Sequence, residues 1–244
     1  MHTDEIIVED LAYQDGETQL LGVLVAPRGT GGQRPGVLLV PAAFGIVEHA
    51  RERARMVAEL GYVVLVADHF GEGRGFSTIE EAMGHVGPLA GNIDGWRTRL
   101  GAALSALRNH PDVDADRIAA IGFCFGGTGV LELAFAGEDL KAVISFHGGL
   151  KLSETADGTN VKASILVCTG ANDPLVPDTD MAEFQRRMHS GTADWQVHIY
   201  GNTLHAFTDP AIDGLNLPVA RYDVRADQRS WRAMEALFAE TLQG

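Results

Sequence analysis

The sequence predicts a single α/β domain over residues 1–244, with a mostly parallel central sheet, helices on both faces and an antiparallel edge at the N-terminal end. Three observations predict this class. Short apolar runs alternate with segments of helical period along most of the chain. Two strand-like segments flank Asp15 and Gly16, a hairpin signal, at its start. A glycine-rich turn follows one apolar run directly. This alternation implies right-handed crossovers, and therefore parallel strands.

Each expected strand is a short run that is either apolar or alternating. The runs are 6–13, 19–25, 37–40, 62–67, 118–121, 142–146, 165–169 and 195–200. Each expected helix places its apolar residues on one face. The helices are 49–60, from about 92 to 109, 125 to at least 133, 178–189 and a C-terminal helix that contains Trp231, Met234, Phe238 and Leu242. The stretch 70–92 has no clear period and six glycines, so it is either a mobile lid or a plain surface connection.

The most informative segment is Gly-Phe-Cys-Phe-Gly-Gly at 122–127, directly after the apolar run 118–121. A strand that ends in Gly-x-nucleophile-x-Gly and turns at once into a helix holds the central side chain on a tight bend, where larger neighbours would collide. The unpaired amides at the start of such a helix favour a thiolate and can also hold an oxyanion. Cys124 is thus a candidate nucleophile, although free cysteines are also common as small buried hydrophobic residues.

Composition excludes several classes of function. The net charge is −14 with no basic cluster, so nucleic acid and anionic membranes are not expected partners. The sequence predicts a cytoplasmic protein. It has two cysteines, no apolar stretch long enough to span a membrane, and no leader pattern at the N-terminus. Cys168 lies inside a strand-like run and is interpreted as core.

Partners for Cys124 are expected just after later strands, because functional residues gather at the carboxyl ends of parallel strands. Asp173 follows the run 165–169, and His205 follows the run 195–200. The chain order nucleophile, acid, histidine is the one that α/β-hydrolases use. His205 would take the thiol proton and return it to a leaving group, while ionised Asp173 would fix the imidazole tautomer.

These residue types also have other interpretations. Asp173 before a proline can be a turn residue, but Asp178 is the better cap for the helix that follows. His198 is expected to face solvent from its strand, whereas His147 and His69, each at a strand end, are expected to make structural hydrogen bonds.

Two backbone amides are expected to bind the oxyanion: that of Phe125, after the nucleophile, and that of Ala43, in the turn after Val40. Phe44, Phe123 and Phe207 lie near strand ends and could line an apolar substrate pocket, with core packing as the alternative.

These motifs, together with the strand end Phe146-His147-Gly148, resemble the dienelactone hydrolase family of the α/β-hydrolase fold, from about residue 20 to the last helix. The resemblance implies a triad of Cys124, Asp173 and His205, oxyanion amides at Ala43 and Phe125, and no cofactor. Two departures matter. The family has a glutamate where this chain has Ala42, and a substrate-binding arginine where it has Asp209. Arg74 is the nearest candidate for a replacement, so a neutral small-molecule ester or lactone fits better than an anionic dienelactone.

Alternatives to this function differ in how well the sequence supports them. Phosphate-loop and dinucleotide signatures fail at Thr128 and Phe76, and no histidine pair has metal-ligand spacing, so no metal is expected. A thioesterase or acyltransferase would share the acyl-cysteine intermediate and stays open. A catalytically retired binding protein also stays open, although the complete triad argues against it. Oligomeric state and lid motion are beyond the sequence.

Overall fold

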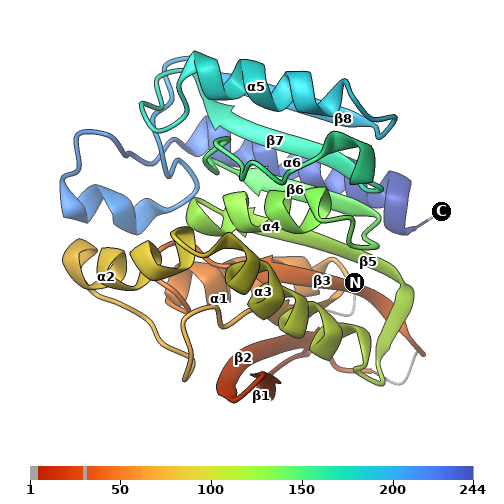
Figure 1. Cartoon of the computed structure of the whole chain (residues 1–244). Helices are drawn as coiled ribbons and strands as arrows, with labels where there is room; N and C mark the ends of the chain where they lie inside the picture. The colour runs from red at the N-terminus through yellow and green to blue at the C-terminus, as the bar shows by residue number, and fades with distance from the viewer. Residues whose placement is uncertain (1–4, 30–31, 244) are drawn as a thin grey trace. The chain divides into compact units, whose positions relative to one another are not determined.

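The computed structural model describes residues 5–29 and 32–243. Residues 1–4, on which the expected lack of a leader partly rests, lie outside this range. The described strands form one eight-stranded sheet in the order β1-β2-β4-β3-β5-β6-β7-β8 (Figure 1). Their bounds are β1 Ile6–Asp15, β2 Thr18–Pro27, β3 Arg34–Val40, β4 Val63–Val66, β5 Val113–Phe123, β6 Ala142–Phe146, β7 Ser164–Gly170 and β8 Trp195–Tyr200. The predicted fold class, a mostly parallel sheet with an antiparallel N-terminal edge, is confirmed.

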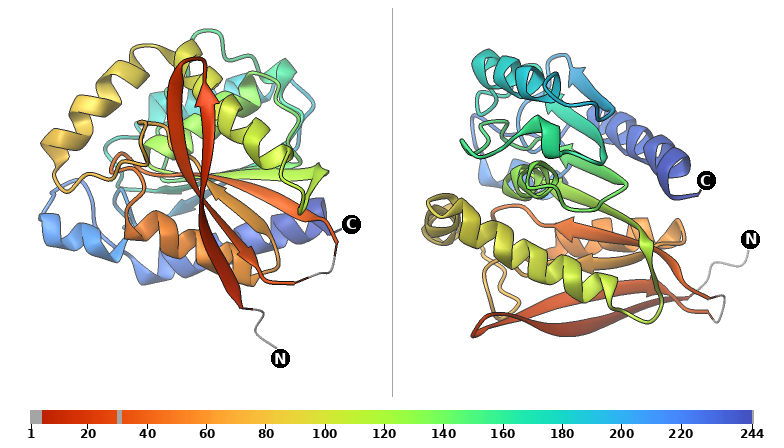
Figure 2. Two further views of the ribbon diagram at one scale, coloured as in Figure 1. Left: turned by 90° about the horizontal axis from the view of Figure 1, so that it is seen from below. Right: turned by 45° about the vertical axis from the view of Figure 1, so that its right-hand side comes forward.

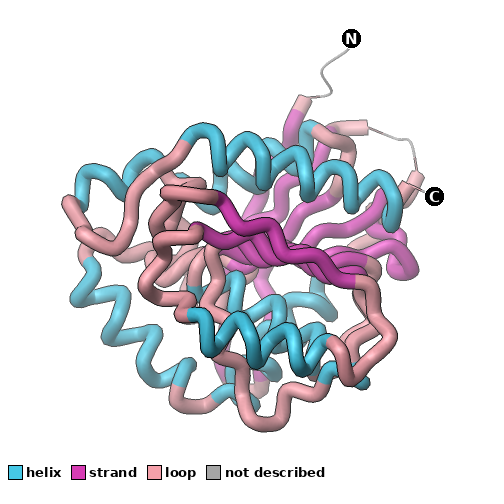
Figure 3. The backbone as a smooth tube through the Cα atoms, turned by 90° about the horizontal axis from the view of Figure 1, so that it is seen from above, coloured by secondary structure: helices cyan, strands magenta, loops and turns pink. Residues whose placement is uncertain are grey.

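After the first three strands, helices and strands largely alternate along the chain. Figure 3 draws the helices in cyan and the strands in magenta. The α-helices are α1 Glu48–Glu59, α2 Ile79–Ala90, α3 Ile93–Arg108, α4 Phe125–Phe135, α5 Asp178–Met188 and α6 Val224–Leu242, with short 3-10 helices at Gly158–Asn160 and Pro210–Leu215. The chain forms two compact units, residues 1–120 and 121–244. Each is described by itself, and the single domain stays a prediction.

The first unit begins with the predicted hairpin. Strands β1 and β2 pair antiparallel along their whole length, with Asp15 opposite Thr18 across a two-residue turn (Figure 2). Gly16 has a positive φ of 58° in this turn, a conformation that glycine adopts without steric cost. Strand β4 then pairs antiparallel with β2 and parallel with β3. Helix α1 packs on β2 and β4, and α3 packs on β1 and β3, so the apolar strands of this unit are covered.

The stretch 70–92 is more ordered than the sequence analysis expected. Half of it is helix α2, which begins after the N-cap Thr78, whose hydroxyl accepts a hydrogen bond from the Glu81 amide. Thr-x-x-Glu is a capping signal that was overlooked because six glycines obscured the helical period. Helix α2 is largely exposed, with only Ala82 and Val86 buried. Motion of this segment as a lid stays a prediction.

The second unit contains the parallel strands β6, β7 and β8, in which Phe146 lies opposite Cys168 and Gly170 opposite Tyr200. Helix α6 packs on β6 and β7, and α4 packs on β6, from opposite sides in Figures 1 and 2. Strand β8 is last in the sheet order, so it is covered incompletely. His198 is half-buried rather than clearly solvent-facing, while its neighbour Ile199 is 57% exposed.

Candidate active site

The turn between β5 and α4 has the strained geometry expected of a nucleophile turn. Strand β5 ends at Phe123, helix α4 begins at Phe125, and Cys124 between them has φ 52° and ψ −118°. A Cβ atom on Gly122 would collide with the carbonyl of Gly126. A positive φ at a residue other than glycine costs free energy and persists only where the surroundings impose it. Gly122 therefore serves the purpose that the sequence analysis assigned to it.

The three side chains of the predicted triad form a continuous chain of contacts. The Nε2 atom of His205 lies 3.0 Å from the Sγ of Cys124, and its Nδ1 lies 2.7 Å from Oδ2 of Asp173. Asp173 follows β7, is 5% exposed, and also accepts a hydrogen bond from the amide of Leu175. The carboxylate is thus held in a fixed orientation against the imidazole.

The loop that carries His205 is tied to a neighbouring segment by its backbone. The His205 amide donates to the carbonyl of Val219, and the Arg221 amide donates to the carbonyl of His205. The next residue, Ala206, has a positive φ of 55°. Cys124, which contacts His205 through its sulfur, and Ala206, which follows His205, therefore both have a strained backbone. Backbone strain of this kind is common at functional sites.

The electrostatic environment favours a charged imidazole. Burial lowers the pKa of His205, but the negative charge of Cys124 and hydrogen bonds to Asp173 and Cys124 outweigh it and raise the pKa to about 10. The arrangement therefore favours a protonated imidazole when the Cys124 sulfur is ionised. Such a pair can deliver a sulfur nucleophile and afterwards a proton.

Cys168 is not part of this chain. It is fully buried in β7, and its desolvation raises the pKa of the thiol to about 12. Neither Cys124 nor Cys168 forms a disulfide bond. The interpretation of Cys168 as a core residue is confirmed, and the two thiols have contrasting environments.

His147 makes the structural hydrogen bonds that the sequence analysis expected of it, but its partners were not foreseen. Its Nδ1 accepts from the backbone amide of Cys124 at 3.1 Å, and its Nε2 lies 2.8 Å from Oγ1 of Thr208. Thr208 is three residues beyond His205, and no motif pointed to it. The only signal in the sequence is that Thr208 has a hydroxyl and lies on the same loop as His205.

Phe123 and Phe207 are packed as core residues. Both are fully buried. Phe123 stacks on Phe146 with ring centroids 4.8 Å apart, and Phe207 meets His147 edge to face at 5.0 Å. These contacts are the core alternative that the sequence left open. The Phe207 ring packs against His147 and is not exposed to a substrate pocket.

The remaining predicted residues lie in the first unit. Ala43 and Phe44 follow β3 in a turn closed by a hydrogen bond from the Gly45 amide to the Ala42 carbonyl. The Phe44 carbonyl accepts from the Phe76 amide. Arg74 is exposed and paired with Glu72, with its Nη2 2.6 Å from the carboxylate. That pairing reduces its value as a partner for a substrate carboxylate.

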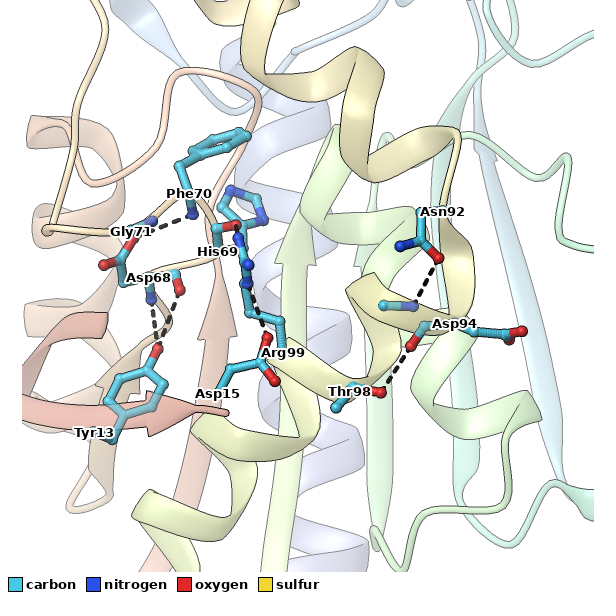
Figure 4. Close-up of polar contacts among 11 residues, drawn as sticks. Tyr13, Asp15, Asp68, His69, Phe70, Gly71, Asn92, Asp94, Thr98 and Arg99 are labelled. Carbon is cyan, nitrogen blue, oxygen red and sulfur yellow. Dashed lines mark hydrogen bonds and ion pairs between the residues drawn. The ribbon is translucent and has the colours of Figure 1, made fainter. Parts of the chain in front are cut away.

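Asp68, at the end of β4, organises the glycine-rich loop of this unit (Figure 4). Its carboxylate accepts hydrogen bonds from four backbone amides, those of Leu21, Phe70, Gly71 and Gly73. Arg99 donates to the carbonyl of the next residue, His69, and pairs with Asp15. A small cavity of about 130 Å³ adjoins this network, lined by His69, Phe70, His85, Pro88, Leu89 and Arg99. The sequence analysis did not foresee this role for Asp68.

Two features of the described part of the chain bear on other functions. Nowhere in residues 5–29 and 32–243 do three or more histidine, cysteine, aspartate or glutamate side chains group as metal ligands would. Within the same residues, every helix is too short or too polar to cross a membrane.

The fold and the strained, glycine-flanked turn at Cys124 are those of an α/β-hydrolase. The sequence model of the Dienelactone hydrolase family matches residues 20–242, and this chain belongs to that family. It is a hydrolase of the dienelactone hydrolase type.

Solved structures and curated relatives agree with the assignment. The structure named m3DLH is 42% identical to this chain, has a TM-score of 0.93, and covers 97% of this chain and 99% of its own. A dienelactone hydrolase-like promiscuous phosphotriesterase, P91, from metagenomic libraries is 41% identical with a TM-score of 0.93, over 97% of this chain and 98% of its own. A Bradyrhizobium protein named "Probable 2-oxo-3-(5-oxofuran-2-ylidene)propanoate lactonase" is 31% identical over 79% of this chain and 80% of its own length.

Proposed function

We propose that this chain cleaves a small neutral ester or lactone through an acyl-cysteine intermediate on Cys124. The observation that carries the proposal is the unbroken contact chain from sulfur to imidazole to carboxylate, with distances of 3.0 and 2.7 Å. In this proposal Cys124 is the nucleophile, His205 the acid and base, and Asp173 the group that orients the imidazole. The Bradyrhizobium lactonase and the family assignment support an acyl substrate.

The proposed reaction has two steps. The Cys124 thiolate attacks the carbonyl carbon, a carbon–sulfur bond forms, and the carbonyl oxygen takes up the electron pair. The oxyanion then collapses, the carbon–oxygen bond to the leaving group breaks, and His205 gives its Nε2 proton to that oxygen. Water next attacks the thioester while His205 takes its proton. The acid leaves and the thiolate is restored beside the imidazolium.

Two backbone amides are proposed to stabilise the oxyanion. Phe125 opens helix α4, where amide dipoles point toward the sulfur end of the turn. Ala43 lies in the turn after β3, and turns at the carboxyl ends of strands provide the second donor in α/β-hydrolases. Phe44 stays a proposed pocket residue on the same topological ground.

The absence of the family glutamate at Ala42 bears on how the thiol is activated. The direct contact of His205 with the sulfur and the raised pKa of its imidazole favour activation by histidine alone. In this proposal Cys124 and His205 form a thiolate–imidazolium ion pair before the substrate binds. No further carboxylate is then needed to activate the thiol.

The charge of the site argues for a neutral substrate. Asp209 stands at the family's arginine position, Arg74 is already paired with Glu72, and the net charge is −14. A substrate carboxylate would meet repulsion without an opposing cation. Thioesters remain an alternative acyl substrate. Their cleavage would pass through the same acyl-cysteine intermediate as ester hydrolysis and would differ from it only in the leaving group. Two free cysteines fit the cytoplasm as the proposed compartment.

The resemblance to P91 favours phosphotriesters as a second substrate class, since that protein is 41% identical over 97% of this chain. The same thiolate would attack phosphorus, form a sulfur–phosphorus bond and expel an alkoxide that takes the proton from His205. Water would then release the phosphodiester.

The test is a substrate panel of neutral esters, anionic and neutral lactones, thioesters and a phosphotriester. Native protein is compared with Cys124→Ala and, as the matched control, Cys168→Ala. The proposal expects turnover of neutral esters that is lost in the first variant and kept in the second. Intact mass should show an acyl adduct on native protein with slow substrates. Equal turnover by native protein and Cys124→Ala refutes the nucleophile, and no turnover of any substrate supports the retired binding protein.

A further inference from the structure

His147 occupies a rigid place at the end of β6. It is 1% exposed, has a positive φ of 41°, and its backbone amide donates to the carbonyl of Cys168 at 2.8 Å. The following Gly148 packs so closely on the start of helix α4 that a Cβ atom there would collide with Ser145 and approach Gly127. A strained backbone inside such close packing has little freedom to move.

The Cys124 amide fixes the protonation pattern of the His147 ring. That N–H lies 2.9 Å from the carbonyl of Phe146 and 3.1 Å from His147 Nδ1, so it is shared between two acceptors. An amide nitrogen can only donate, so Nδ1 must be unprotonated in this contact. The proton of the neutral ring is therefore on Nε2, where it donates to Oγ1 of Thr208 at 2.8 Å.

Thr208 connects this ring to the loop of the triad histidine. Its side chain is 1% exposed, and it lies on the segment in which the Asp209 amide donates to the carbonyl of Ala206. The His147 ring also packs edge to face on His205, with centroids 5.3 Å apart. One imidazole thus touches both loops that bring sulfur and base together.

We propose that His147 is a positioning residue that fixes the separation between Cys124 Sγ and His205 Nε2 by linking their two loops. The inference rests on the proposed function of the triad. Cys124 and His205 follow different strands. Cys124 itself has a positive φ, and His205 is followed by Ala206, which also has one. Displacements near 1 Å at reacting atoms can cost about 100-fold in rate, so a rigid link between the loops has a direct kinetic value.

The test compares three substitutions in the full-length protein. His147→Leu removes both hydrogen bonds. His147→Asn keeps an acceptor near the Nδ1 position and suits the positive φ, while losing the reach to Thr208. Thr208→Val removes only the second bond. His189→Leu is the matched control, because His189 is an exposed residue at the end of helix α5 that contacts none of these groups.

The readouts are kcat and KM for a neutral ester, the iodoacetamide rate of Cys124, and near-ultraviolet circular dichroism. His147→Leu is expected to lower kcat about 10- to 100-fold with KM nearly unchanged and to slow alkylation. His147→Asn should recover much of the loss, and Thr208→Val should show a smaller decrease. If His147→Leu does not fold, the other two variants decide the matter.

Several outcomes would overturn the inference. Native values of kcat and alkylation rate in folded His147→Leu would show that the link is dispensable. If His147→Asn lowers kcat as much as His147→Leu does, the hydrogen bond that Asn was expected to keep does not matter. If Thr208→Val keeps the native kcat, the hydrogen bond to Thr208 does not matter. Failure of the proposed function looks different, because native protein would then lack any activity that depends on Cys124.

Discussion

The imidazole of His205 is held between a sulfur and a carboxylate, with Nε2 3.0 Å from Cys124 and Nδ1 2.7 Å from Asp173. Each contact favours the protonated ring, and together they raise the pKa of His205 to about 10 despite the opposing effect of burial. The two contacts therefore favour a protonated imidazole when the Cys124 sulfur is ionised. Two consequences of these contacts can be measured.

Alkylation should discriminate strongly between the two cysteines. Iodoacetamide reacts with thiolates, and at pH 7 we expect Cys124 to be labelled at least about 100-fold faster than Cys168, whose pKa is raised to about 12 by burial. Peptide mass spectrometry over time measures both rates. His205→Ala should slow labelling of Cys124 and leave Cys168 unchanged. Similar rates at the two sites in native protein would contradict a thiolate held by His205.

Asp173→Asn should separate orientation from folding. The amide keeps the shape of the side chain and can hydrogen-bond the imidazole, but it removes the charge that favours the Nδ1–H tautomer and the imidazolium. We expect kcat to fall about 100- to 10,000-fold with a small change in KM, by analogy of chemistry with other triads. Asp178→Asn, an exposed first-turn residue of helix α5, is the control. A decrease below fivefold for Asp173→Asn would argue against its role.

The residues of the contact chain were accessible from sequence because each lies within five residues of the end of a strand. In a parallel sheet the strand order and the chain order alone bring such residues to one edge. The strained φ values of Cys124, His147 and Ala206 were less accessible, because only the glycines around Cys124 announce a tight turn. Thr208 was missed because its hydrogen bond to His147 joins residues that are far apart in sequence.

Errors elsewhere have equally local causes. Strand β5 begins at Val113 rather than at 118, because the charged residues Asp114, Asp116 and Arg117 obscure its first half. Helix α5 begins at Asp178 but its N-cap is Pro177, so Asp178 lies in the first turn instead of capping it. Asp68 was passed over because a carboxylate that binds backbone amides leaves no spacing pattern in the sequence.

Asp209→Arg should shift the preference toward anionic lactones. Asp209 caps the 3-10 helix Pro210–Leu215 by accepting from the Ala211 amide, and its charge would repel a carboxylate near the histidine loop. Asp209→Asn keeps an acceptor for the cap and removes only the charge. We expect the ratio of kcat/KM for an anionic lactone to that for a neutral ester to rise modestly in Asn and about tenfold in Arg, with the gain reduced by salt. An unchanged ratio in both variants would place carboxylate selection elsewhere.

His69 provides a prediction about stability that is independent of catalysis. It is 1% exposed, lies beside Phe70 and Trp96, and its carbonyl accepts from Arg99. Burial and the positive charge of Arg99 lower its pKa from 6.5 to about 3, while the Ala42 carbonyl opposes the shift. The imidazole is therefore neutral in the folded chain at neutral pH.

Protonation of His69 should destabilise the folded protein as the pH falls. Between its ordinary pKa of 6.5 and about 3 the unfolded chain binds a proton at His69 that the folded chain does not, so the free energy of unfolding contributed by this group decreases with falling pH. The slope from one such group is about 1.4 kcal/mol per pH unit. We expect the stability difference between native protein and His69→Gln to diminish by about 2 kcal/mol from pH 6.5 to pH 5, in urea unfolding at several pH values. His189→Gln, at an exposed position, is the control for replacing a histidine by glutamine. If native protein and His69→Gln lose stability in parallel over this range, His69 titrates normally in the folded state and its neutral, buried form is excluded.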